Sequence, residues 1–368
     1  MLGGRLVGAV PRAYGWSVEE LPLDAPVVSQ LWSQLQQQGS VDSPFLGLEW
    51  CSVLAQYRSA RQRQSVLLAS FHAEPVALLP IQFTHGPGGV RTLGIAGSGW
   101  LHPDHLDVVA RTEHRAGGAT AMLRHLMRER TWDMLDLDGL TASGGLAAAL
   151  RAIVPPVALR LPERDIVAPY VDLRRRSFGD LFPSRNLRDQ LRRGLRQAER
   201  TGGGFDVVTE PDEVVRHLEE LMSLHNERFG VRSAVFATPE RRQFHAEAVR
   251  RLGGPGVRIY RLVAEGVNAA LLYALVHRRA VYYYSMGMRP SVGMSPGRTL
   301  LGHAIASAAQ EGYDEFDLLR GDHAFKYRFA SGHRTDRRVV AARFTPRGLL
   351  GAGAVVARSL HARHAAAA

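Results

Sequence analysis

The chain has 368 residues, of which 45% are hydrophobic and 22% are charged, a composition typical of globular proteins and long enough for two cores. Its net charge of +11 favours polyanionic or phosphate-bearing partners. The single cysteine, Cys51, excludes an internal disulfide and a cysteine metal cluster. No apolar run reaches 18 residues and the N-terminus does not predict a signal peptide, so we expect a cytoplasmic protein without membrane insertion.

The first half of the chain predicts a hairpin, a helix and a strand in that order. Residues 65–83 read as two strands joined by a turn, because apolar residues dominate both sides of a short polar break. Residues 117–130 predict a helix that opens at glycines, and "TWDMLDLDGL" (131–140) predicts a strand.

The second half repeats this order. Residues 257–276 predict a hairpin, 280–288 a third strand, 296–312 a glycine-led helix, and "GYDEFDLLRG" (312–321) a strand. The two final strands share the pattern aromatic-Asp-x-apolar-Asp-Leu, running from Trp132 and from Tyr313. Such internal similarity predicts an α+β protein of two related domains.

A proline-containing charged stretch, residues 162–176, predicts the boundary between the two domains. We expect an N-terminal domain over 14–165, a C-terminal domain over 166–346, and a C-terminal helix or frayed tail over 347–368. Helices are expected in the second domain at about 185–200, 211–229 and 238–251.

An arginine row marks the helix predicted over 185–200. Arg188, Arg192, Arg196 and Arg200 recur at every fourth position and so share one helical face. Like charges at this spacing cost roughly 0.2–0.5 kcal/mol per pair, a cost that a bound phosphate relieves. The alternative is a solvated face in an arginine-rich protein.

The stretch "MSPGRTLL" (294–301) lies between a predicted strand and a predicted helix. A glycine turn at a helix start lets backbone N–H groups face an anion, which makes this stretch a candidate pyrophosphate cradle. "HRAGGATAML" (114–123) occupies the equivalent place in the first half. An ordinary tight turn explains both stretches as well.

His225 and Arg228 are three residues apart on the helix predicted over 211–229 and so share a face. The imidazole is a candidate general base or hydrogen-bonding positioner. A structural histidine is the alternative interpretation.

Lys326, in "FDLLRGDHAFKYRF" (316–329), is the only lysine in the chain. Phe325, Lys326 and Arg328 follow a turn over 320–322, and fixed cations at the end of a strand suit an oxyanion or a phosphate. A lysine offers a compact point charge, which matches a single oxyanion better than the planar fork of arginine. The sequence contains no GxGxxG, Walker A, HExxH or GxSxG pattern.

Together, "LRRGLRQAERTGG", "YSMGMRPSVGMSPGRTLL" and "EFDLLRGDHAFKYRFA" resemble the GNAT-related acyltransferases of the CelD-like type, which are related to the Fem peptidoglycan aminoacyltransferases. The resemblance covers roughly residues 40 to 345. It includes the weaker stretches "SPFLGLEW", "ALLPIQF" and "LGIAGSGWLHPDHLDVV" in the first half. Phe325 stands where the family commonly has tyrosine, and "RPSVGMSPG" is a stretched form of the usual GNAT glycine loop.

The resemblance implies two tandem GNAT-like domains and transfer of an acyl group, acetyl above all, from acyl-CoA to an amine or hydroxyl. The acceptor is then a small molecule, a sugar, or a precursor of the cell envelope or of an exopolysaccharide. Lys326 would stabilise the oxyanion, and Asp322, His225 and Arg228 would hold or deprotonate the acceptor. The cofactor-binding residues would be Gly293, Ser295, Gly297, Arg298 and Arg320. The substrate-binding residues would be Tyr284, Phe325, Arg328, Arg192 and Arg196.

Two other functions remain open at this stage. A Fem-like transferase would take aminoacyl-tRNA as the donor, which the charge of +11, the arginine row and the stretched glycine loop favour. A non-catalytic module that binds polyanions would need the charge but not the segment around Lys326.

Overall fold

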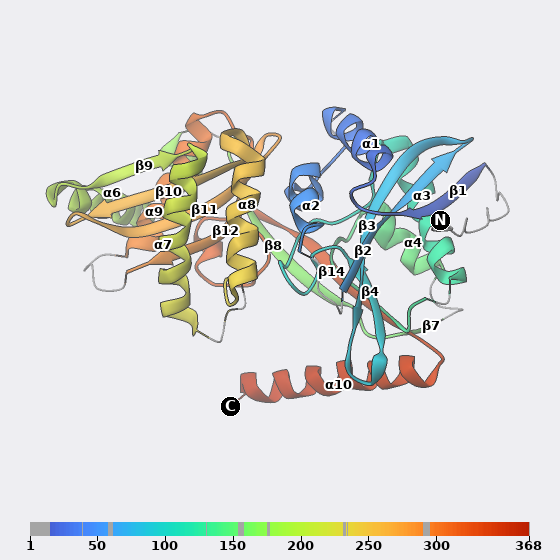
Figure 1. Ribbon diagram of the computed structural model, residues 1–368. Coiled ribbons are helices and arrows are strands. Elements are labelled where there is room, and N and C mark those ends of the chain that lie inside the picture. Colours follow the sequence, from blue (N-terminus) through green and yellow to red (C-terminus); the bar gives the residue numbers. More distant parts are fainter. Residues whose placement is uncertain are drawn as a thin grey trace. The chain divides into compact units, whose positions relative to one another are not determined.

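The computed structural model describes residues 15–38, 40–57, 62–129, 131–153, 158–174, 177–230, 233, 235–289 and 295–367. The chain forms two compact units: the first unit comprises residues 1–165 and 337–368, and the second comprises residues 166–336 (Figure 1). Residues 337–346, which the sequence analysis assigned to the second domain, lie in the first unit. The assignment of separate functions to these two domains remains a prediction.

The first unit is an α+β unit built around a mixed sheet. Its strands run in the order β1-β2-β3-β4-β6, followed by the second part of β14, while β5 pairs with β3 and β7 pairs with β14. The strands are β1 (Trp16–Leu21), β2 (Gln62–Phe71), β3 (Glu74–His85), β4 (Arg91–Ile95), β5 (Val109–Ala110), β6 (Met134–Thr141), β7 (Ala158–Arg160) and β14 (Gly332–Arg343). The helices are α1 (Pro26–Gln37), α2 (Leu48–Leu54), α3 (Thr112–Arg128), α4 (Gly145–Ile153) and α10 (Pro346–Ala367).

Apolar faces of these helices and strands form the first core. Helices α3 and α4 pack against each other, α3 contacts β1, β2 and β3, and α1 contacts α2 and β3. Three tryptophans, Trp32, Trp50 and Trp132, are at most 1% exposed. Burial of such side chains stabilises the fold by about 1.5–3 kcal/mol each relative to exposure.

The second unit has a sheet of the same kind. Its order is β9-β10-β11-β12-β13-β8, next to which lies the first part of β14. The strands are β8 (Arg164–Asp172), β9 (Gly204–Val208), β10 (Val257–Ala264), β11 (Val267–His277), β12 (Ala280–Met288) and β13 (Glu315–Asp317). The helices are α5 (Phe178–Leu181), α6 (Arg185–Arg200), α7 (Pro211–Phe229), α8 (Pro239–Gly256) and α9 (Pro296–Gln310).

Helices cover both faces of this second sheet. Helices α7 and α8 pack together over β10, β11 and β12 and stand in front of these strands in Figure 1. Helices α6 and α9 pack against each other closely, because Gly194 of α6 lies against Thr299, and Gly302 of α9 lies against Leu191. A Cβ atom at Gly194 or Gly302 would lie less than 3 Å from those side chains.

The two units repeat one topology. The order β1-β2-β3-β4-β6 corresponds to β9-β10-β11-β12-β13, and in each series only the last pair is parallel. Both central hairpins turn through two residues with positive φ, His72-Ala73 and Glu265-Gly266. The twist of such a turn matches the right-handed twist of the two strands that it joins. The repeat predicted from the sequence is thus a repeat of structure.

The shared pattern at β6 and β13 has a structural meaning in both units. Its first aspartate holds an arginine at the start of the parallel partner strand: Asp133 pairs with Arg91, the first residue of β4, and Asp314 pairs with Arg279, which directly precedes β12. Its second aspartate holds an arginine of β14. The pattern therefore fixes the ends of the parallel strand pair.

One expectation about a helix differs from the structure. Helix α3 begins at Thr112 rather than at the glycines, so Gly117 and Gly118 lie inside it. A Cβ atom at Gly117 would lie 2.4 Å from the Trp16 ring, and one at Gly118 would lie 2.9 Å from Ala77. These glycines permit packing on the sheet instead of forming a turn. The C-terminal segment is helical as far as Ala367.

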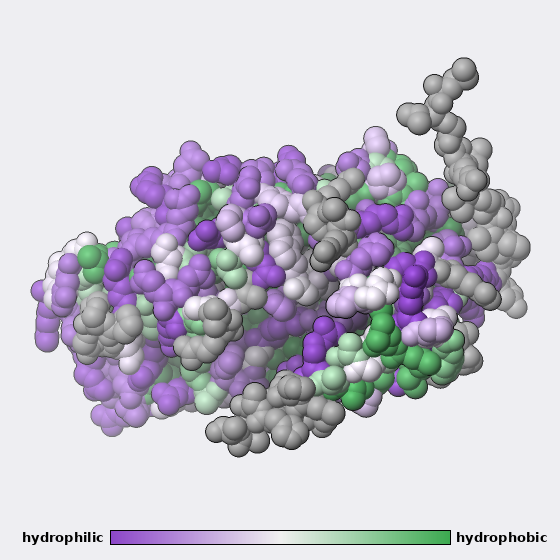
Figure 2. Space-filling model, turned by 60° about the horizontal axis from the view of Figure 1, so that its bottom comes forward, coloured by the Kyte–Doolittle hydropathy of each residue, from purple (hydrophilic) through white to green (hydrophobic). Residues whose placement is uncertain are grey.

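Helix α10 leaves apolar side chains exposed near its start. Figure 2 shows hydrophobic residues gathered over this part of the first unit. Phe344, Leu349, Leu350 and Val356 are 45–67% exposed. None of the helices in the described part of the chain combines the length and the apolar character needed to cross a bilayer.

Candidate active site

The candidate active site lies in the second unit, where two parallel strands part. Strand β12 pairs with β13 only from Ala280 to Tyr282, opposite Glu315 to Asp317. Beyond the pair of Tyr282 and Asp317, β12 continues to Met288 while the chain after β13 turns away. Within the described residues, no ladder joins the later part of β12 to β13. Main-chain groups of this part of β12 therefore face the gap.

A β-bulge lies directly beyond the point where the strands part. On β12, Ser285 pairs with Tyr273 and Tyr283 pairs with Ala274, so Tyr284 is the extra residue between them. Bulges redirect main-chain and side-chain groups and are frequent beside active sites. The half-buried Tyr284 is thereby aimed differently from a regular strand residue.

Helix α9 begins seven residues after β12 ends, so its positive N-terminus follows the gap. Ser295 is the N-cap residue, and its side chain makes no capping hydrogen bond. Arg298 donates to Ser295 Oγ at 3.0 Å and also to Gln190. Gly293 lies outside the described residues.

Gly297, in the first turn of α9, allows the helix to approach β12 closely. A Cβ atom there would lie 2.9 Å from Met286 Sδ and 2.5 Å from Met288 Cε. The two methionine side chains fill the space that the missing Cβ leaves. The helix start is therefore held against the last residues of β12.

His225 faces the same strand from α7. Its Nδ1 lies 3.3 Å from the Met286 carbonyl oxygen and 3.2 Å from Ser285 Oγ, and its Nε2 lies 2.8 Å from Ser233 Oγ. The carbonyl requires a donor, which assigns the proton to Nδ1 and leaves Nε2 to accept from Ser233. Burial and, to a smaller extent, Arg228 lower the pKa of His225, so the ring is neutral at pH 7.

An aromatic cluster surrounds the bulge. His245 of α8 is fully buried, and its ring contacts those of Tyr273 and Tyr284. Burial, with a smaller contribution from Arg241, lowers the pKa of His245 to about 3. Among the described residues the Tyr273 hydroxyl has no hydrogen-bond partner, and burial raises the pKa of this group well above its usual value.

The chain after β13 is held by Lys326, whose side chain is only 4% exposed. Its Nζ donates to the carbonyl oxygens of Leu318 at 2.7 Å, Leu319 at 3.0 Å and Arg320 at 2.7 Å. An ammonium group has three N–H donors, and each donates to one of these three carbonyl oxygens. The expected direct contact between Lys326 and an oxyanion is therefore not available in this arrangement.

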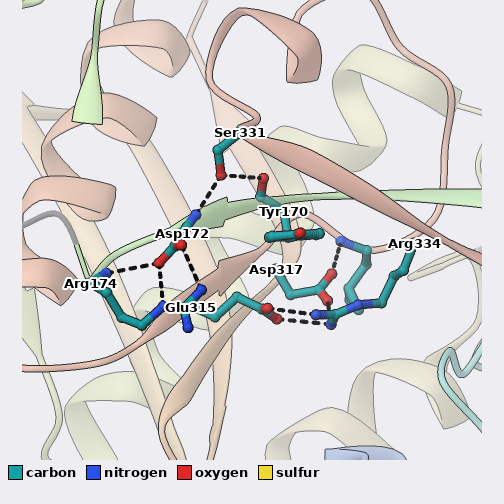
Figure 3. A network of polar contacts seen from close by, with 8 residues as sticks. Tyr170, Asp172, Arg174, Glu315, Asp317, Ser331 and Arg334 are labelled. Carbon is teal, nitrogen blue, oxygen red and sulfur yellow. Dashed lines mark hydrogen bonds and ion pairs between the residues drawn. The ribbon is translucent and has the colours of Figure 1, made fainter. Parts of the chain in front are cut away.

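A second set of contacts holds the same turn from β14 (Figure 3). Arg334 donates to Asp317 Oδ2 at 2.8 Å and to both carboxylate oxygens of Glu315, at 2.8 and 2.5 Å, and lies over the Tyr170 ring. Burial alone would lower the pKa of Arg334, but the hydrogen bonds and charges of the two carboxylates outweigh it and raise that pKa. The fully buried Asp317 is thus paired with a guanidinium.

The remaining predicted residues of this segment lie at its surface. Asp322, Phe325 and Arg328 are exposed and Arg320 is half-buried. A hydrogen bond to Asp322 is the main cause that raises the pKa of the Tyr327 hydroxyl, and desolvation contributes less. The Phe325 ring stacks on His323 with centroids 6.0 Å apart. These side chains are accessible to a substrate.

The arginine row on α6 is not uniform. Arg188 donates to the Phe182 and Pro183 carbonyl oxygens at 2.6 and 2.9 Å, which ties it to the chain before the helix. Arg192 lies over the Phe178 ring at 5.5 Å and lines a pocket of about 350 Å³ with Phe205 and His303. Arg196 and Arg200 are exposed.

The structure thus brings some predicted residues together and leaves others apart. Met286 links two of the groups, because its carbonyl contacts His225 and its sulfur lies where a Cβ atom at Gly297 would meet it. Sequence reasoning missed Ser233 and Ser285 beside His225, which follow no periodic pattern with it. Within the described residues, no three His, Cys, Asp or Glu side chains are grouped so as to hold a metal ion.

Comparison with known proteins agrees with this geometry. Residues 185–327 match the model of the acetyltransferase (GNAT) domain. No curated protein sequence matches the chain significantly. Residues 185–327 are therefore similar to the GNAT acetyltransferase domain.

Solved structures extend the likeness to most of the chain. FemX has a TM-score of 0.59 at 9% identity, covering 87% of this chain and 96% of FemX. The C-terminal domain of a putative lysylphosphatidylglycerol synthetase from Agrobacterium fabrum has a TM-score of 0.55 at 13% identity, covering 89% and 95%. L-PGS from Bacillus licheniformis has a TM-score of 0.52 at 13% identity, covering 87% and 92%. The chain has the α+β, GNAT-related fold of Fem-like proteins.

Proposed function

We propose that this protein transfers an acyl group, acetyl above all, from acyl-CoA to an amine or hydroxyl of a small-molecule, sugar or cell-envelope precursor. The observation that supports it most is the gap between β12 and β13, with the bulge at Tyr284 on one side and the start of α9 at its end. A thioester needs main-chain donors for its carbonyl, and a pyrophosphate needs a positive helix end. This gap offers both.

The donor's pyrophosphate is proposed to bind at the first turn of α9. The N–H groups there have no partner within the helix, and the Ser295 side chain does not cap them. Arg298 adds a fixed positive charge beside them. The main-chain groups of residues 283–288 are proposed to align the acyl carbonyl.

The proton of the acceptor is proposed to leave through His225. The acceptor nitrogen or oxygen attacks the thioester carbonyl carbon, the new bond forms, and the oxyanion then collapses as the C–S bond breaks and CoA leaves as a thiolate. Nε2 of the neutral imidazole takes the acceptor's proton, directly or through the Ser233 hydroxyl, and the thiolate is protonated afterwards. Asp322 and Arg228 are proposed to hold the acceptor.

Lys326 is proposed to act as a positioning residue. Its three hydrogen bonds fix the turn that carries the chain away from β12 and so keep the two strands apart. This role replaces direct oxyanion stabilisation, because the ammonium has its three donors on carbonyl oxygens.

Calorimetric titration with acetyl-CoA tests the donor. We expect saturable binding to the intact protein, and an affinity about tenfold lower for Arg298→Gln, because one charge-assisted contact is lost. Arg185→Gln is the matched control, since that side chain is 90% exposed and pairs with Asp189 at 3.9 Å. No detectable binding of acetyl-CoA would remove acyl-CoA as the donor. Incubation of acceptor candidates with acyl-CoA, followed by mass spectrometry, identifies the acceptor.

Aminoacyl-tRNA is the second candidate donor. The exposed Arg193, Arg196 and Arg200 on α6 favour it, because an exposed row of guanidinium groups suits a phosphate backbone. In that case the same chemistry attacks an ester carbonyl instead of a thioester, and the leaving group is the tRNA hydroxyl.

A further inference from the structure

The first unit contains a polar pocket of about 560 Å³ at its own parallel strand pair. Strands β4 and β6 pair only at Thr92 with Met134 and at Leu93 with Leu135. The pocket opens on the sheet face beyond these pairs and is lined from β2, β3, β4, β6 and β14. Its volume suits one or two small rings.

A rigid loop forms one wall of this pocket. The amide of Gln82, which is 3% exposed, donates to the Ser98 carbonyl at 2.7 Å and accepts from the Gly97 N–H at 2.9 Å. Trp100 follows in this loop and lines the pocket with its half-buried ring. The pocket is therefore lined by an aromatic ring that follows the segment held by Gln82.

The lining is rich in groups that pair with hydroxyls. It includes Gln62, Thr92, Asp136, Asp138, His85 and His102. Gln64, two residue pairs along β2 and β3 from Gln62, is 5% exposed, and within the described part of the chain neither its amide nitrogen nor its amide oxygen has a hydrogen-bond partner. The buried Ser98 hydroxyl oxygen also lacks one. Unsatisfied buried polar atoms are costly and point to a polar ligand.

The charges in this pocket disfavour a phosphate. Among the described lining residues Arg338 is the one arginine, and that guanidinium donates to both oxygens of Asp136, at 2.8 and 2.6 Å. Asp138 adds a second carboxylate. In contrast to the second unit, 16 residues separate β4 from α3, and Glu113 stands in the first turn of that helix. A pyrophosphate therefore meets neither a free helix end nor an uncommitted arginine here.

From this combination we infer that the pocket of the first unit binds a neutral, hydroxyl-rich ligand, namely one or two sugar rings. The Trp100 ring packs on the C–H face of a sugar, while the carboxylates and amides accept and donate at its hydroxyls. This site is separate from the donor site proposed for the second unit, and its occupation does not require the transfer reaction.

Titration of the full chain with cellotriose and with N,N′-diacetylchitobiose tests this inference, with uridine diphosphate as the anionic probe. We expect saturable binding of at least one neutral oligosaccharide, seen by calorimetry and by tryptophan fluorescence, and no binding of uridine diphosphate at the pocket. Trp100→Ala and Asp138→Asn should each weaken sugar binding about tenfold or more, while Glu113→Gln, an exposed change in the same unit, should not.

Acetyl-CoA binding serves as the independent readout of folding, and it should be unchanged in Trp100→Ala. The inference is overturned if neither oligosaccharide binds the intact protein. It is also overturned if both pocket variants bind like the parent, or if uridine diphosphate competes with the sugar. Loss of acetyl-CoA binding in the parent protein would refute the donor proposal and leave the sugar result standing.

Discussion

Asp317 and Lys326 both form hydrogen bonds with the main chain of the same residue, Leu319. Asp317 Oδ1 accepts from the Leu319 N–H at 2.7 Å, and Lys326 Nζ donates to the Leu319 carbonyl at 3.0 Å. Leu319 has φ of +54°, a conformation that costs a non-glycine residue about 1–2 kcal/mol. The two side chains stabilise this turn, and the turn sends the chain away from β12. The gap that we propose for the donor therefore depends on them.

Lys326→Met tests whether the hydrogen bonds from Lys326 hold this turn in place, an arrangement that we call the clamp. The methionine fills a similar volume but leaves three carbonyl groups without their donor, so we expect a loss of about 2–4 kcal/mol in the free energy of unfolding. We expect turnover to fall with it, because the strands are no longer held apart. Urea unfolding and steady-state kinetics measure the two effects.

Lys326→Arg separates the clamp from direct catalysis. A planar guanidinium cannot direct its protons to three carbonyls as the ammonium does, so we expect intermediate stability and low turnover. If Lys326→Met kept the parent's stability but lost turnover about a hundredfold or more, the ammonium would be acting on the substrate and the clamp would be the wrong explanation.

Asp317→Asn tests the contacts that Asp317 makes at the same turn. The amide oxygen still accepts from Leu319, but a fully buried carboxylate paired with Arg334 is lost, so we expect a decrease of about 2–4 kcal/mol in the free energy of unfolding. Asp172→Asn is the matched control from the same network (Figure 3). Its partner Arg174 is 74% exposed, and such pairs contribute about 0–1 kcal/mol. Equal losses in both variants would show that burial does not matter here.

Much of this fold could be predicted from the sequence, because local signals and tertiary packing agree. Helices α6 and α7 and strand β12 have the predicted bounds, since Ser184 and Pro211 mark the helix starts and apolar periodicity marks the faces. The start of α3 was predicted wrongly, because Gly117 makes room for Trp16, a partner distant in sequence.

The site could be predicted only in part. The segment around Lys326 is distinctive in sequence, but its composition does not tell where the ammonium points. Likewise the pairing of His225 with Ser233 depends on how the chain returns after α7. A sequence shows which side chains are present, while hydrogen-bond partners across a sheet depend on the folded register.

His225→Gln tests the proposed base. General-base catalysis contributes about 10²–10⁴ in rate, so we expect kcat to fall by that amount with the affinity for acetyl-CoA retained. In the parent, the rate should rise with pH and reach a plateau, with its midpoint below 6.5, since burial lowers the pKa of His225 from that value. His217→Gln, on the same helix but half-exposed, should leave both the rate and the profile unchanged. A profile that persists in His225→Gln would assign the base to another group.

Acid should destabilise the fold through His245. The unfolded chain takes up a proton near pH 6.5, whereas the folded His245 does so only near pH 3. The contribution of His245 to the free energy of unfolding is therefore complete above pH 6.5. It decreases by about 1.4 kcal/mol for each pH unit below that value. Urea unfolding between pH 7 and pH 5 measures this slope. His245→Gln removes the titrating group, so its slope should be smaller by about that amount, while an unchanged slope would exclude His245 as the cause.

The arginine row on α6 decides between the two donors. If aminoacyl-tRNA is the donor, Arg193→Gln with Arg196→Gln should weaken tRNA binding and reduce the dependence of log K on log salt by about one to two units, because each phosphate contact releases counterions. If acyl-CoA is the donor, the double variant should bind acetyl-CoA like the parent, and the parent should give no tRNA gel shift at about 150 mM salt. Arg216→Gln, a 66% exposed change on α7, controls for net charge. If the control weakens the gel shift about half as much as the double variant does, in proportion to the charge removed, binding follows overall charge alone and the α6 arginines have no specific part in donor recognition.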